Sequence, residues 1–499
     1  MLAAVRSAVL EGVDGRVVTV EVHVSRGLPG YTVVGLPDTA GRESRERVRA
    51  ALLSSQLEYP QQRVTVNLAP ASVRKTGAGL ELAVALALTC AAGDGLPDGV
   101  LDGVAVLGEL GLDGRVRAVA GTLALVDAVA RVGVEAVIVP EANAAEAQLV
   151  QGVKVRVARS LGELHACIRG DAPWPDPPEV PGPCSATTDH DEPLDLADVR
   201  GLEGARRALA VAAAGAHHLL LVGPPGVGKT MLARRLPTIM APLEHDEALE
   251  VTKVHSAAGP HRGPGLRIDP PFRAPHHSAS MVSLIGGGSA RVRPGEISLA
   301  HRGALFLDEL PEFPVGVLEA LRQPLEERVV RVSRASGTLE FPADFLLVAC
   351  ANACPCGRPV HRCTCSDVQR ARYARRLSAP LLDRFDVRLQ VKSAGSEPGE
   401  PSAVVAARVA AAVERQRFRL RSTPWRRNAH VPAGALDRFA ALDAAARAAW
   451  LDECRVRRLT GRGAARIRRV ARTIADLDDA AAIGVGHVCS AAQMREDMW

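Results

Sequence analysis

The chain contains 499 residues, which is more than one ordinary hydrophobic core accommodates and predicts two to four domains. Hydrophobic residues make up 47% and charged residues 23%, as in a globular, soluble protein, and no apolar run approaches the roughly 20 residues of a membrane span. The net charge of +5 permits nucleic-acid binding without demanding it. No signal peptide is visible, so we expect a cytoplasmic protein, whose ten cysteines are more often metal ligands or buried residues than disulfides.

The first 168 residues are predicted to form one domain, because strand-like and helix-like segments alternate along them. Residues 17–24 alternate in places with the period of a half-buried strand. Further predicted elements are a helix at 124–132 and strands at 63–68 and 136–140. Prolines and polar residues then dominate 169–194, which we interpret as an extended linker.

A phosphate-binding loop is predicted where the pattern G-x-x-x-x-G-K-S/T follows the apolar run 218–222 and precedes a helix over 231–240. Its glycines let backbone N–H groups turn inward around a phosphate, and the helix N-terminus adds partial positive charge. Lys229 would reach the β- and γ-phosphates of ATP, and Thr230 would hold Mg²⁺. A surface turn rich in glycine and proline is the alternative, which the order of strand, loop and helix disfavours. The loop comprises Gly223, Pro224, Pro225, Gly226, Val227, Gly228, Lys229 and Thr230.

Two later apolar strands end in polar side chains that would complete an ATPase site. Residues 304–307 lead into Asp308, which would hold Mg²⁺ directly or through water, and Glu309, which would orient and polarise the attacking water. Residues 345–351 lead into Asn352, whose amide can contact the γ-phosphate or the same water. Each feature alone is common, but downstream of a phosphate loop the acidic pair favours hydrolysis.

An arginine, Arg384, directly precedes an aromatic residue in the segment 379–386. In ring-shaped ATPases such an arginine crosses the subunit interface and stabilises transition-state charge on the γ-phosphate of the neighbour. Local pairing with Asp383 or Asp386 explains the same arginine equally well.

The order of phosphate loop, acidic pair, asparagine and arginine resembles that of AAA+ ATPases. A closer resemblance, to the Mg-chelatase-type branch and within it to YifB/ComM-like proteins, covers essentially the whole chain. It is carried by the cysteine cluster described below and by residues 272–280, 284–288, 294–301 and 307–313. The resemblance implies an α/β protein with a Lon-protease-like α+β domain, an AAA+ P-loop α/β domain and a C-terminal helical lid, at residues 1–168, 195–395 and 396–499.

The same resemblance implies a function. It implies a homo-hexameric motor that depends on ATP and Mg²⁺ and acts on single-stranded or branched DNA during recombination. One rival is the ATPase subunit of a magnesium chelatase, which the Lon-like domain and the cysteine cluster disfavour. Another is a remodelling chaperone that grips a protein client in its pore. Stimulation of the ATPase by DNA or by a client protein distinguishes the motor from the chaperone.

The chain between the phosphate loop and the acidic pair is longer than a minimal ATPase core requires, which indicates an insert. In the family that the chain resembles, this insert and a hairpin before the asparagine-bearing strand face the central pore. Residues 329–341, two alternating segments around a Ser-Gly turn, fit such a hairpin. Ordinary arginines on a solvated hairpin are the alternative to DNA contacts. We expect DNA phosphates to be gripped by Arg331 and Arg334, and in second place by Arg291 and Arg293.

Four cysteines form the pattern C-x-C-x₆-C-x-C at Cys354, Cys356, Cys363 and Cys365. Four soft thiolates within twelve residues suit tetrahedral Zn²⁺, although each pair is more closely spaced than in most zinc sites. We expect a structural zinc ion without a catalytic role that rigidifies the loop after Asn352. Reduced, unliganded thiols in a loop are the alternative.

Residues 106–121 and 136–140 resemble the proteolytic domain of Lon proteases, which uses a Ser–Lys dyad. Where Lon carries its serine this chain has Gly79, and where Lon carries its lysine it has Thr122 and Leu123. We therefore predict no peptidase activity and expect a ring scaffold or a DNA-contacting collar.

The C-terminal region is rich in arginine and has helical periodicity, with Thr460 as a predicted helix start. In AAA+ proteins the lid supplies an arginine to the nucleotide that the same subunit binds. The resemblance of residues 460–477 to the family's lid helix assigns this role to Arg462, with Arg466 in second place. A solvated basic face or DNA contact by the same residues is the alternative.

Overall fold

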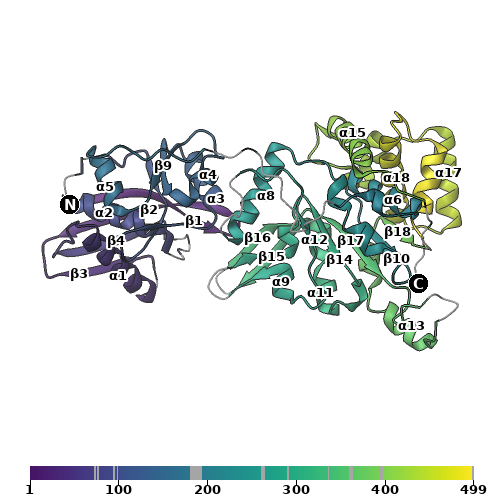
Figure 1. Ribbon diagram of the computed structural model, residues 1–499, viewed down its shortest axis with the longest axis horizontal. Coiled ribbons are helices and arrows are strands. Elements are labelled where there is room, and N and C mark those ends of the chain that lie inside the picture. The colour runs from purple at the N-terminus through teal and green to yellow at the C-terminus, as the bar shows by residue number, and fades with distance from the viewer. Residues whose placement is uncertain are drawn as a thin grey trace.

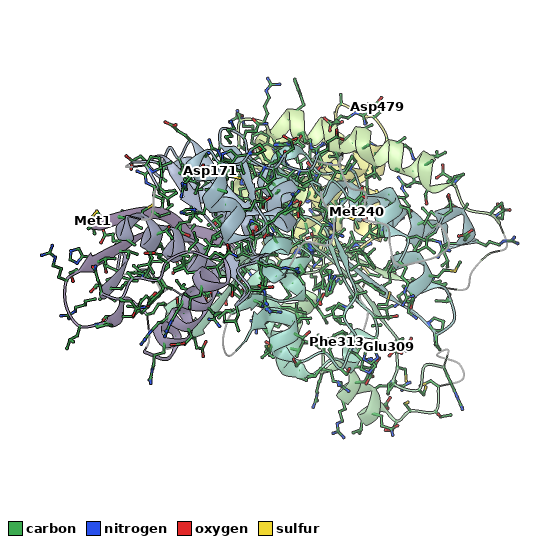
Figure 2. All side chains as sticks on the ribbon, turned by 60° about the vertical axis from the view of Figure 1, so that its left-hand side comes forward. Met1, Asp171, Met240, Glu309, Phe313 and Asp479 are labelled. Atoms are coloured by element: carbon green, nitrogen blue, oxygen red, sulfur yellow. The ribbon has the colours of Figure 1, made fainter. Side chains whose placement is uncertain are left out.

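The computed structural model describes residues 1–36, 38–71, 73, 75, 78–93, 96–97, 99–179, 182, 194–259, 265–288, 292–334, 337–358, 363–392, 395 and 397–496. The molecule is elongated, with an N-terminal sheet at one end, a parallel sheet in the middle and a helical C-terminal region at the other end (Figure 1). Met1 lies at the outer end of the N-terminal part, far from Glu309 (Figure 2). Among the described helices, none has the length and apolar character needed to cross a membrane.

The N-terminal part is built on a mixed seven-stranded sheet. Its order is β3 (Gly30–Val34), β4 (Arg63–Ala69), β2 (Asp14–Ser25), β1 (Leu2–Glu11), β5 (Val104–Val106), β8 (Ala136–Pro140) and β9 (Lys154–Ala158). The β1–β2 and β2–β4 pairs are antiparallel and the other pairs are parallel. The strands predicted at 17–24, 63–68 and 136–140 lie in β2, β4 and β8 and are confirmed.

Successive strand residues point to opposite faces of this sheet, so each face has its own core. In β1, for example, Val5 and Val9 pack in one cluster and Ala8 in the other. The helices α1 (Asp38–Ser54), α2 (Glu81–Ala92) and α5 (Leu161–Arg169) cover the first face, whereas α3 (Thr122–Arg131) and α4 (Ala144–Ala147) cover the second. The helix predicted at 124–132 is α3. A short hairpin joins β6 (Glu109–Leu110) and β7 (Val116–Arg117).

The central part is built on five parallel strands, which confirms the α/β fold class. Their order is β11 (Phe272–Arg273), β14 (Ala304–Leu307), β17 (Leu346–Ala351), β10 (Leu219–Val222) and β18 (Val387–Gln390). Leu219 and Leu221 pack with the C-terminal helices, and Leu220 and Val222 pack on the opposite face. Because both faces are covered, these strands are continuous apolar runs rather than alternating ones.

The helix after the phosphate loop is shorter than predicted. An α-helix, α7 (Lys229–Ala233), is followed by a 3₁₀ turn at Leu236–Ile239 instead of continuing to residue 240. Pro237 lacks a backbone N–H and interrupts the α-helical hydrogen bonds. The other helices of this part are α6 (Glu203–Gly215), α8 (His245–Ala258), α9 (Met281–Ile285), α10 (Glu296–Leu299), α11 (Val315–Ala320), α12 (Arg322–Glu327), α13 (Asp367–Ala374) and α14 (Ala379–Leu382).

Two hairpins project from the central part. The expected hairpin before the asparagine-bearing strand is present and consists of β15 (Val329–Arg334) and β16 (Gly337–Pro342). The second joins β12 (Gly286–Gly287) to β13 (Arg293–Pro294) within the insert. The hairpin β15–β16 lies at the end of the central part that faces the N-terminal sheet (Figure 1).

The C-terminal region is helical, as predicted. It consists of α15 (Ser402–Leu420), α16 (Leu436–Phe439), α17 (Ala444–Val456), α18 (Gly461–Leu477) and α19 (Val485–Gln493). Thr460 caps α18, because its hydroxyl accepts a hydrogen bond of 3.2 Å from the backbone N–H of Gly463. Ile467, Val470 and Ile474 form the buried stripe of this helix.

The N-terminal part rests directly on the central part. The backbone N–H of Gly121, at the start of α3, donates to the carbonyl of Ser256 in α8 over 3.1 Å. Lys253 of α8 pairs with Asp127 of α3 at 2.6 Å. Val13, in the β1–β2 turn, packs in the same cluster as Phe341 of β16. The contact therefore joins two N-terminal elements to a helix and a hairpin of the central part.

Candidate nucleotide-binding site and cysteine cluster

The phosphate loop has a conformation that depends on its glycines. Gly226 and Gly228 have φ angles of 74° and 96°, in the left-handed region that side chains with a Cβ disfavour. A methyl group at Gly223 would lie 2.4 Å from the carbonyl oxygen of Val391 in the segment after β18. The loop can therefore follow this path close to its neighbours only with glycine at these positions.

The side chain of Lys229 lies within the phosphate loop. Its Nζ donates to the carbonyl oxygens of Gly223 and Pro224, both at 2.8 Å, and to Oδ1 of Asn352 at 3.2 Å. Burial lowers the pKa of Lys229, which Asp308 and Glu309 partly offset. The ammonium group is thus held by neutral acceptors. A phosphate group, which binds an ammonium group more strongly because it is charged, can replace them.

The two residues expected to hold Mg²⁺ lie in contact with each other. The hydroxyl of Thr230 donates to Oδ2 of Asp308 over 2.9 Å, so two oxygen ligands already stand side by side. Hydroxyl and carboxylate oxygens suit Mg²⁺, which binds proteins through few ligands and substrate phosphates. These residues meet because β14 and β17 pair with Leu307 opposite Ala349, and Ala351 lies opposite Val222 of β10. The carboxyl ends of three parallel strands thereby reach one edge.

Glu309 stands beside a residue to which sequence reasoning assigned no role, His277. Nδ1 of His277 lies 3.7 Å from Oε2 of Glu309. The imidazole also lies against that of His276, with ring centroids 4.0 Å apart and the ring planes tilted by 35°, and meets Phe313 edge-on. His277 follows β11, the neighbour of β14, so the rule that parallel strands end at one edge could have found it. It places a polar ring from the insert against the expected catalytic carboxylate.

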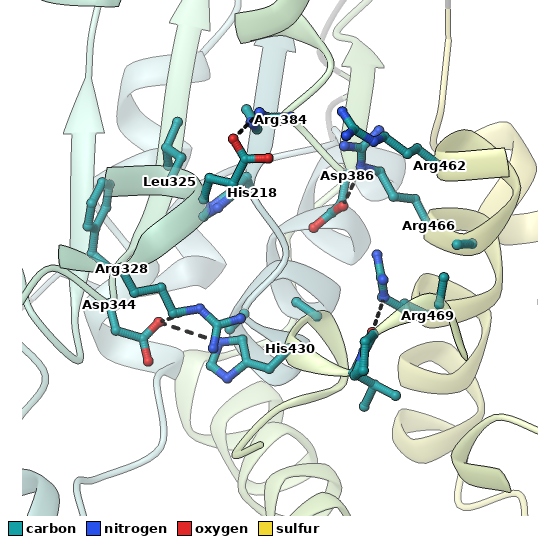
Figure 3. Close-up of a pocket in the computed structure, with 18 of the residues that line it drawn as sticks. His218, Leu325, Arg328, Asp344, Arg384, Asp386, His430, Arg462, Arg466 and Arg469 are labelled. Carbon is teal, nitrogen blue, oxygen red and sulfur yellow. Dashed lines mark hydrogen bonds and ion pairs between the residues drawn. The ribbon is translucent and has the colours of Figure 1, made fainter. Parts of the chain in front are cut away.

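The two remaining site arginines lie together at a different place. Arg384 and Arg462 both line a cavity of about 410 Å³ between the central sheet and α18 (Figure 3). The arginines around it are Arg328, Arg384, Arg462, Arg466 and Arg469, against the carboxylates of Glu326, Asp344 and Asp386. The excess of positive charge makes this cavity suited to an anion.

The cavity lies at the opposite edge of the sheet from the phosphate loop. His218 and Phe345, which line it, directly precede β10 and β17. The four residues of β10 span about 13 Å between this edge and the phosphate loop. The structure therefore does not bring Arg462 to Lys229, contrary to the expectation that Arg462 reaches the nucleotide of its own subunit.

The arginines of this cavity differ in how they are held. Arg384 pairs with Glu326 at 2.6 Å rather than with Asp383 or Asp386, and its Nε is buried without a hydrogen-bond partner among the described residues. Arg466 is buried between Asp383, at 2.7 Å, and Asp386, at 3.2 Å. Arg462 is exposed, and its side chain makes no hydrogen bond or ion pair with any residue that the structure describes.

Buried histidines line the wall of the cavity. Burial lowers the pKa of His218 to about 4 and that of His430 to about 3. Burial alone would raise the pKa of Asp344, but the positive charges of Arg302 and Arg328 hold it at about 2. The wall therefore carries the carboxylate of Asp344 beside neutral imidazoles, and the arginines of α18 face it.

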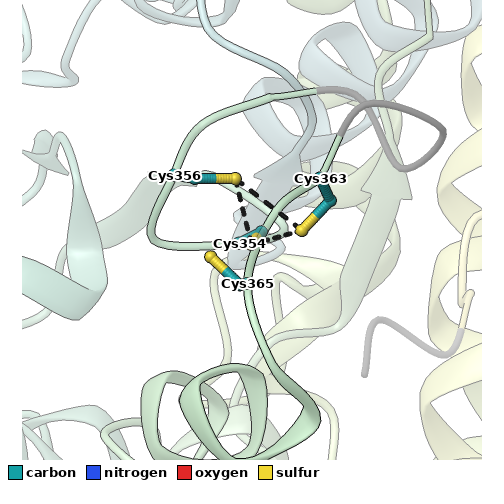
Figure 4. A group of neighbouring side chains, drawn as sticks. All are labelled: Cys354, Cys356, Cys363 and Cys365. Carbon is teal, nitrogen blue, oxygen red and sulfur yellow. Dashed lines mark hydrogen bonds between the residues drawn. The ribbon is translucent and has the colours of Figure 1, made fainter.

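The four cysteines of the predicted zinc site meet in one group (Figure 4). Their sulfur atoms lie within 4.8 Å of one another. Sγ of Cys354 is 3.4 Å from that of Cys356 and 3.1 Å from that of Cys363. Four thiolates at about 2.3 Å from one zinc ion stand about 3.8 Å apart, so the donors fit a tetrahedral site. A hydrogen bond from the backbone amide of Arg358 lowers the pKa of Cys356.

The expected DNA-contacting arginines fall into three groups. Arg331 is engaged by two carboxylates, with Nε 2.7 Å from Glu340 and a further ion pair to Glu327. Arg293 is exposed, and its guanidinium group has no hydrogen-bond or ion-pair partner in the described part of the chain. Arg291 and the side chain of Arg334 lie outside the described residues.

The Lon-like positions offer neither a nucleophile nor a base. Gly79 packs near Val119, and a methyl group there would lie 3.5 Å from Cγ1 of that valine. Thr122 is buried, and its hydroxyl donates to the carbonyl of Val119 at 3.0 Å. Leu123 is fully buried. These positions therefore serve packing in this chain, and Thr122 is also the first residue of α3.

Fold and site together define a class of protein. A parallel sheet with a phosphate loop after β10, an acidic pair after β14 and an asparagine after β17 is the arrangement of a P-loop ATPase of the AAA+ type. Models of the magnesium chelatase family match most of the chain: "Magnesium chelatase, subunit ChlI" matches 195–398, "Subunit ChlI of Mg-chelatase" 20–143, and "Magnesium chelatase, subunit ChlI C-terminal" 399–495.

Relatives of similar length give a closer assignment. A protein of Mycobacterium tuberculosis, described as uncharacterized, is 43% identical over 498 residues, which is 98% of each chain. YifB of Escherichia coli is 40% identical over 503 residues, and competence protein ComM of Haemophilus influenzae is 40% identical over 505 residues. Both alignments cover 99% of this chain and 97% of the relative. The chain belongs to the YifB/ComM-like family of Mg-chelatase-type AAA+ proteins.

Membership of this family carries two consequences for the chain. The family is one of ATPases, so it implies ATP and Mg²⁺ at the phosphate loop, and its members typically oligomerise. A weaker local similarity, 26% identity over 188 residues, links 33% of this chain to Lon protease 2 of Bacillus subtilis. This similarity agrees with a Lon-protease-like N-terminal part.

Proposed function

We propose that the protein is an ATP-driven, hexameric DNA motor that promotes branch migration during recombination. The observation that carries the proposal is the division of the ATPase machinery between two edges of one sheet, with the phosphate loop at one edge and Arg384 and Arg462 at the other. A single chain cannot bring these halves together, whereas adjacent subunits of a ring can. The similarity to competence protein ComM supports DNA as the substrate.

In this proposal the residues at the carboxyl edge bind and hydrolyse ATP. Lys229 neutralises the β- and γ-phosphates, while Thr230 and Asp308 hold the Mg²⁺ that stabilises their charge. Glu309 orients and polarises the attacking water, and Asn352 contacts the γ-phosphate or that water. Arg384 of the adjacent subunit supplies positive charge to the transition state.

The lid arginine takes a different place from the one expected. Because Arg462 shares a cavity with Arg384 and is free of local partners, we assign it to the nucleotide of the neighbouring subunit as well. Arg466 is then a positioning residue that fixes α18 to Asp383 and Asp386. We propose domains at 1–168, 195–395 and 396–499, joined after the first by a linker at 169–194.

DNA contact is proposed for the insert and the hairpin β15–β16. Arg293 has a free guanidinium group, whereas Arg331 would have to leave two carboxylates to reach a phosphate. Arg293 is therefore the first residue to test and Arg331 the second, which reverses the order expected from the sequence. Arg291 and Arg334 keep their place as candidates for phosphate contacts.

The cysteine cluster is proposed to hold one structural zinc ion through Cys354, Cys356, Cys363 and Cys365. The close approach of the four sulfur atoms supports this assignment. Elemental analysis of protein purified without added metal should find about one zinc per subunit. Correctly folded protein without zinc contradicts the assignment.

The motor is tested with a three- or four-stranded DNA junction. We expect the wild type to unwind it with ATP, and Lys229→Ala to abolish both nucleotide binding and unwinding. Glu309→Gln should still bind ATP but hydrolyse it at least roughly 100-fold more slowly, because the general base is lost. Arg293→Ala should weaken DNA binding and its salt dependence while leaving basal ATP hydrolysis unchanged.

The outcomes of this experiment separate the possible functions. Unwinding that persists in Glu309→Gln refutes the assigned chemistry. ATP hydrolysis that responds to a protein client and not to DNA favours a remodelling chaperone. The descriptions of the matching family models keep the magnesium chelatase ATPase subunit as a second candidate, which predicts ATP-dependent Mg²⁺ insertion into a porphyrin.

A further inference from the structure

We propose that the cysteine cluster braces the phosphate loop, so that metal bound at its four thiolates raises the affinity of the site for nucleotide. The inference rests on the proposed ATP and zinc sites and goes beyond them, because it assigns the metal an effect on nucleotide binding. Nucleotide site and cluster share one loop, the segment between β17 and α13.

The first link runs through Asn352. This residue directly follows β17, and Cys354 comes two positions later. Oδ1 of Asn352 accepts a hydrogen bond from Nζ of Lys229, so the start of the cluster is bonded to the central cation of the phosphate loop. A displacement of Cys354 therefore changes where this amide points.

The second link is direct packing on the phosphate loop. Residues 354–357 form a turn in which the N–H of Gly357 donates to the carbonyl of Cys354 at 3.0 Å. Gly357 has a φ of 67°, and a methyl group on it would lie 3.2 Å from Cγ of Pro225. The turn thus touches the second proline of the phosphate loop with no space to spare.

The third link leads from the other end of the cluster to the acidic pair. Cys365 directly precedes Ser366, whose hydroxyl caps α13 by accepting the N–H of Gln369 at 3.2 Å. Arg376, just after α13, pairs with Glu312 at 3.5 Å. Glu312 belongs to the turn that follows Glu309, since its N–H donates to the carbonyl of Glu309 at 2.7 Å. The cluster is therefore connected both to the phosphate loop and to the turn that follows Glu309.

Metal supplies the energy that this brace needs. Among the described residues of the loop between β17 and α13, only Cys354 is buried. The loop therefore has little apolar packing of its own. Binding of zinc by four thiolates provides folding free energy to such a segment. Without the ion, no bond ties the four sulfur atoms together, and the turn at Gly357 can leave Pro225.

The test compares nucleotide affinity with zinc content in the full-length protein. We expect the double variant Cys356→Ser, Cys363→Ser to lose zinc and to bind a fluorescent ATP analogue, with Mg²⁺ present, roughly tenfold more weakly. Cys454→Ser, which changes a cysteine of α17 outside the cluster, is the matched control and should keep both zinc and affinity. Circular dichroism and thermal unfolding show whether each variant is folded.

A second pair of variants separates the brace from any loss of folding. Gly357→Ala keeps all four cysteines but presses on Pro225, so it should weaken nucleotide binding at unchanged zinc content. Gly152→Ala carries the same kind of backbone strain, at a φ of 83°, with no described atom within 4 Å of the added methyl group. It should leave nucleotide affinity and zinc content unchanged.

Loss of zinc with unchanged nucleotide affinity overturns the inference but leaves the ATPase proposal standing. A wild type that binds zinc but no nucleotide overturns the proposed function instead.

Discussion

Glu309 lies where two loops from neighbouring strands meet. Its φ of 52° places it in the left-handed region, which is uncommon for a residue other than glycine. His277, from the loop after β11, approaches it to 3.7 Å. At the scale of single residues, the insert thus reaches the proposed catalytic base, so a ligand on the insert can influence hydrolysis through one imidazole.

His277 is expected to position Glu309. We predict that His277→Ala lowers kcat for ATP roughly tenfold, which corresponds to about 1.4 kcal/mol, with little change in KM. The reason is that the imidazole contacts the carboxylate and not the phosphate loop. His277→Asn, which keeps a polar contact, should recover part of the rate. His245→Ala, at the exposed start of α8, is the control. Equal losses in both alanine variants contradict a specific role for His277.

At the scale of elements, the two edges of the parallel sheet have different chemistry. The carboxyl edge carries the phosphate loop and the acidic pair, which suit a phosphate with its metal. The amino edge is buried against α18 and carries His218 next to Asp386, His217, Asp344 and Arg328. Leu347, in β17, donates its N–H to Nδ1 of His218 over 3.1 Å. The neutral imidazole is therefore part of the hydrogen bonding that fixes β10 beside β17.

Stability should depend on pH through this edge. His218 has a pKa of about 4 in the fold against 6.5 when unfolded, so the unfolded state binds more protons between these values. Its contribution is complete above pH 6.5 and is lost as the pH falls toward 4. From pH 7.5 to 5.5 the loss is about 1.4 kcal/mol for this histidine alone.

The variant His218→Asn tests this expectation. Asparagine keeps an acceptor for the N–H of Leu347 but does not titrate. Thermal unfolding at pH 7.5 and 5.5 should show a smaller decrease for the variant than for the wild type. An identical decrease in both proteins contradicts a buried neutral His218.

At the scale of the whole molecule, the cavity lined by Arg384 and Arg462 contains no part of the phosphate loop. Arg384 and Arg462 belong to different regions, the central sheet and α18, and the packing of these regions brings them to one cavity. The N-terminal part meanwhile rests on α8 and on the hairpin β15–β16. A ring built from such chains would couple the nucleotide of one subunit to the lid of the next and to the N-terminal part.

Mixing inactive variants tests whether Arg384 acts across an interface. Lys229→Ala lacks its own phosphate site, and Arg384→Ala cannot complete that of a neighbour. In a random mixture about a quarter of the sites combine an intact loop with an intact neighbouring arginine, so ATP hydrolysis should return. Measurement of ATPase activity before and after subunit exchange decides the point. No recovery in exchanged rings shows that Arg384 acts within its own subunit.

The sequence by itself determined the nucleotide-binding half of the site. The motif 223–230, the acidic pair and Asn352 each directly follow an apolar strand, and parallel strands must end at a common edge. Four cysteines within twelve residues likewise could not stray far from one another. The contacts of Glu309 with His277, of Pro225 with Gly357 and of Arg384 with Glu326 were decided only by the tertiary structure. They join residues from separate loops, whose meeting depends on strand order and packing and leaves no local pattern in the chain.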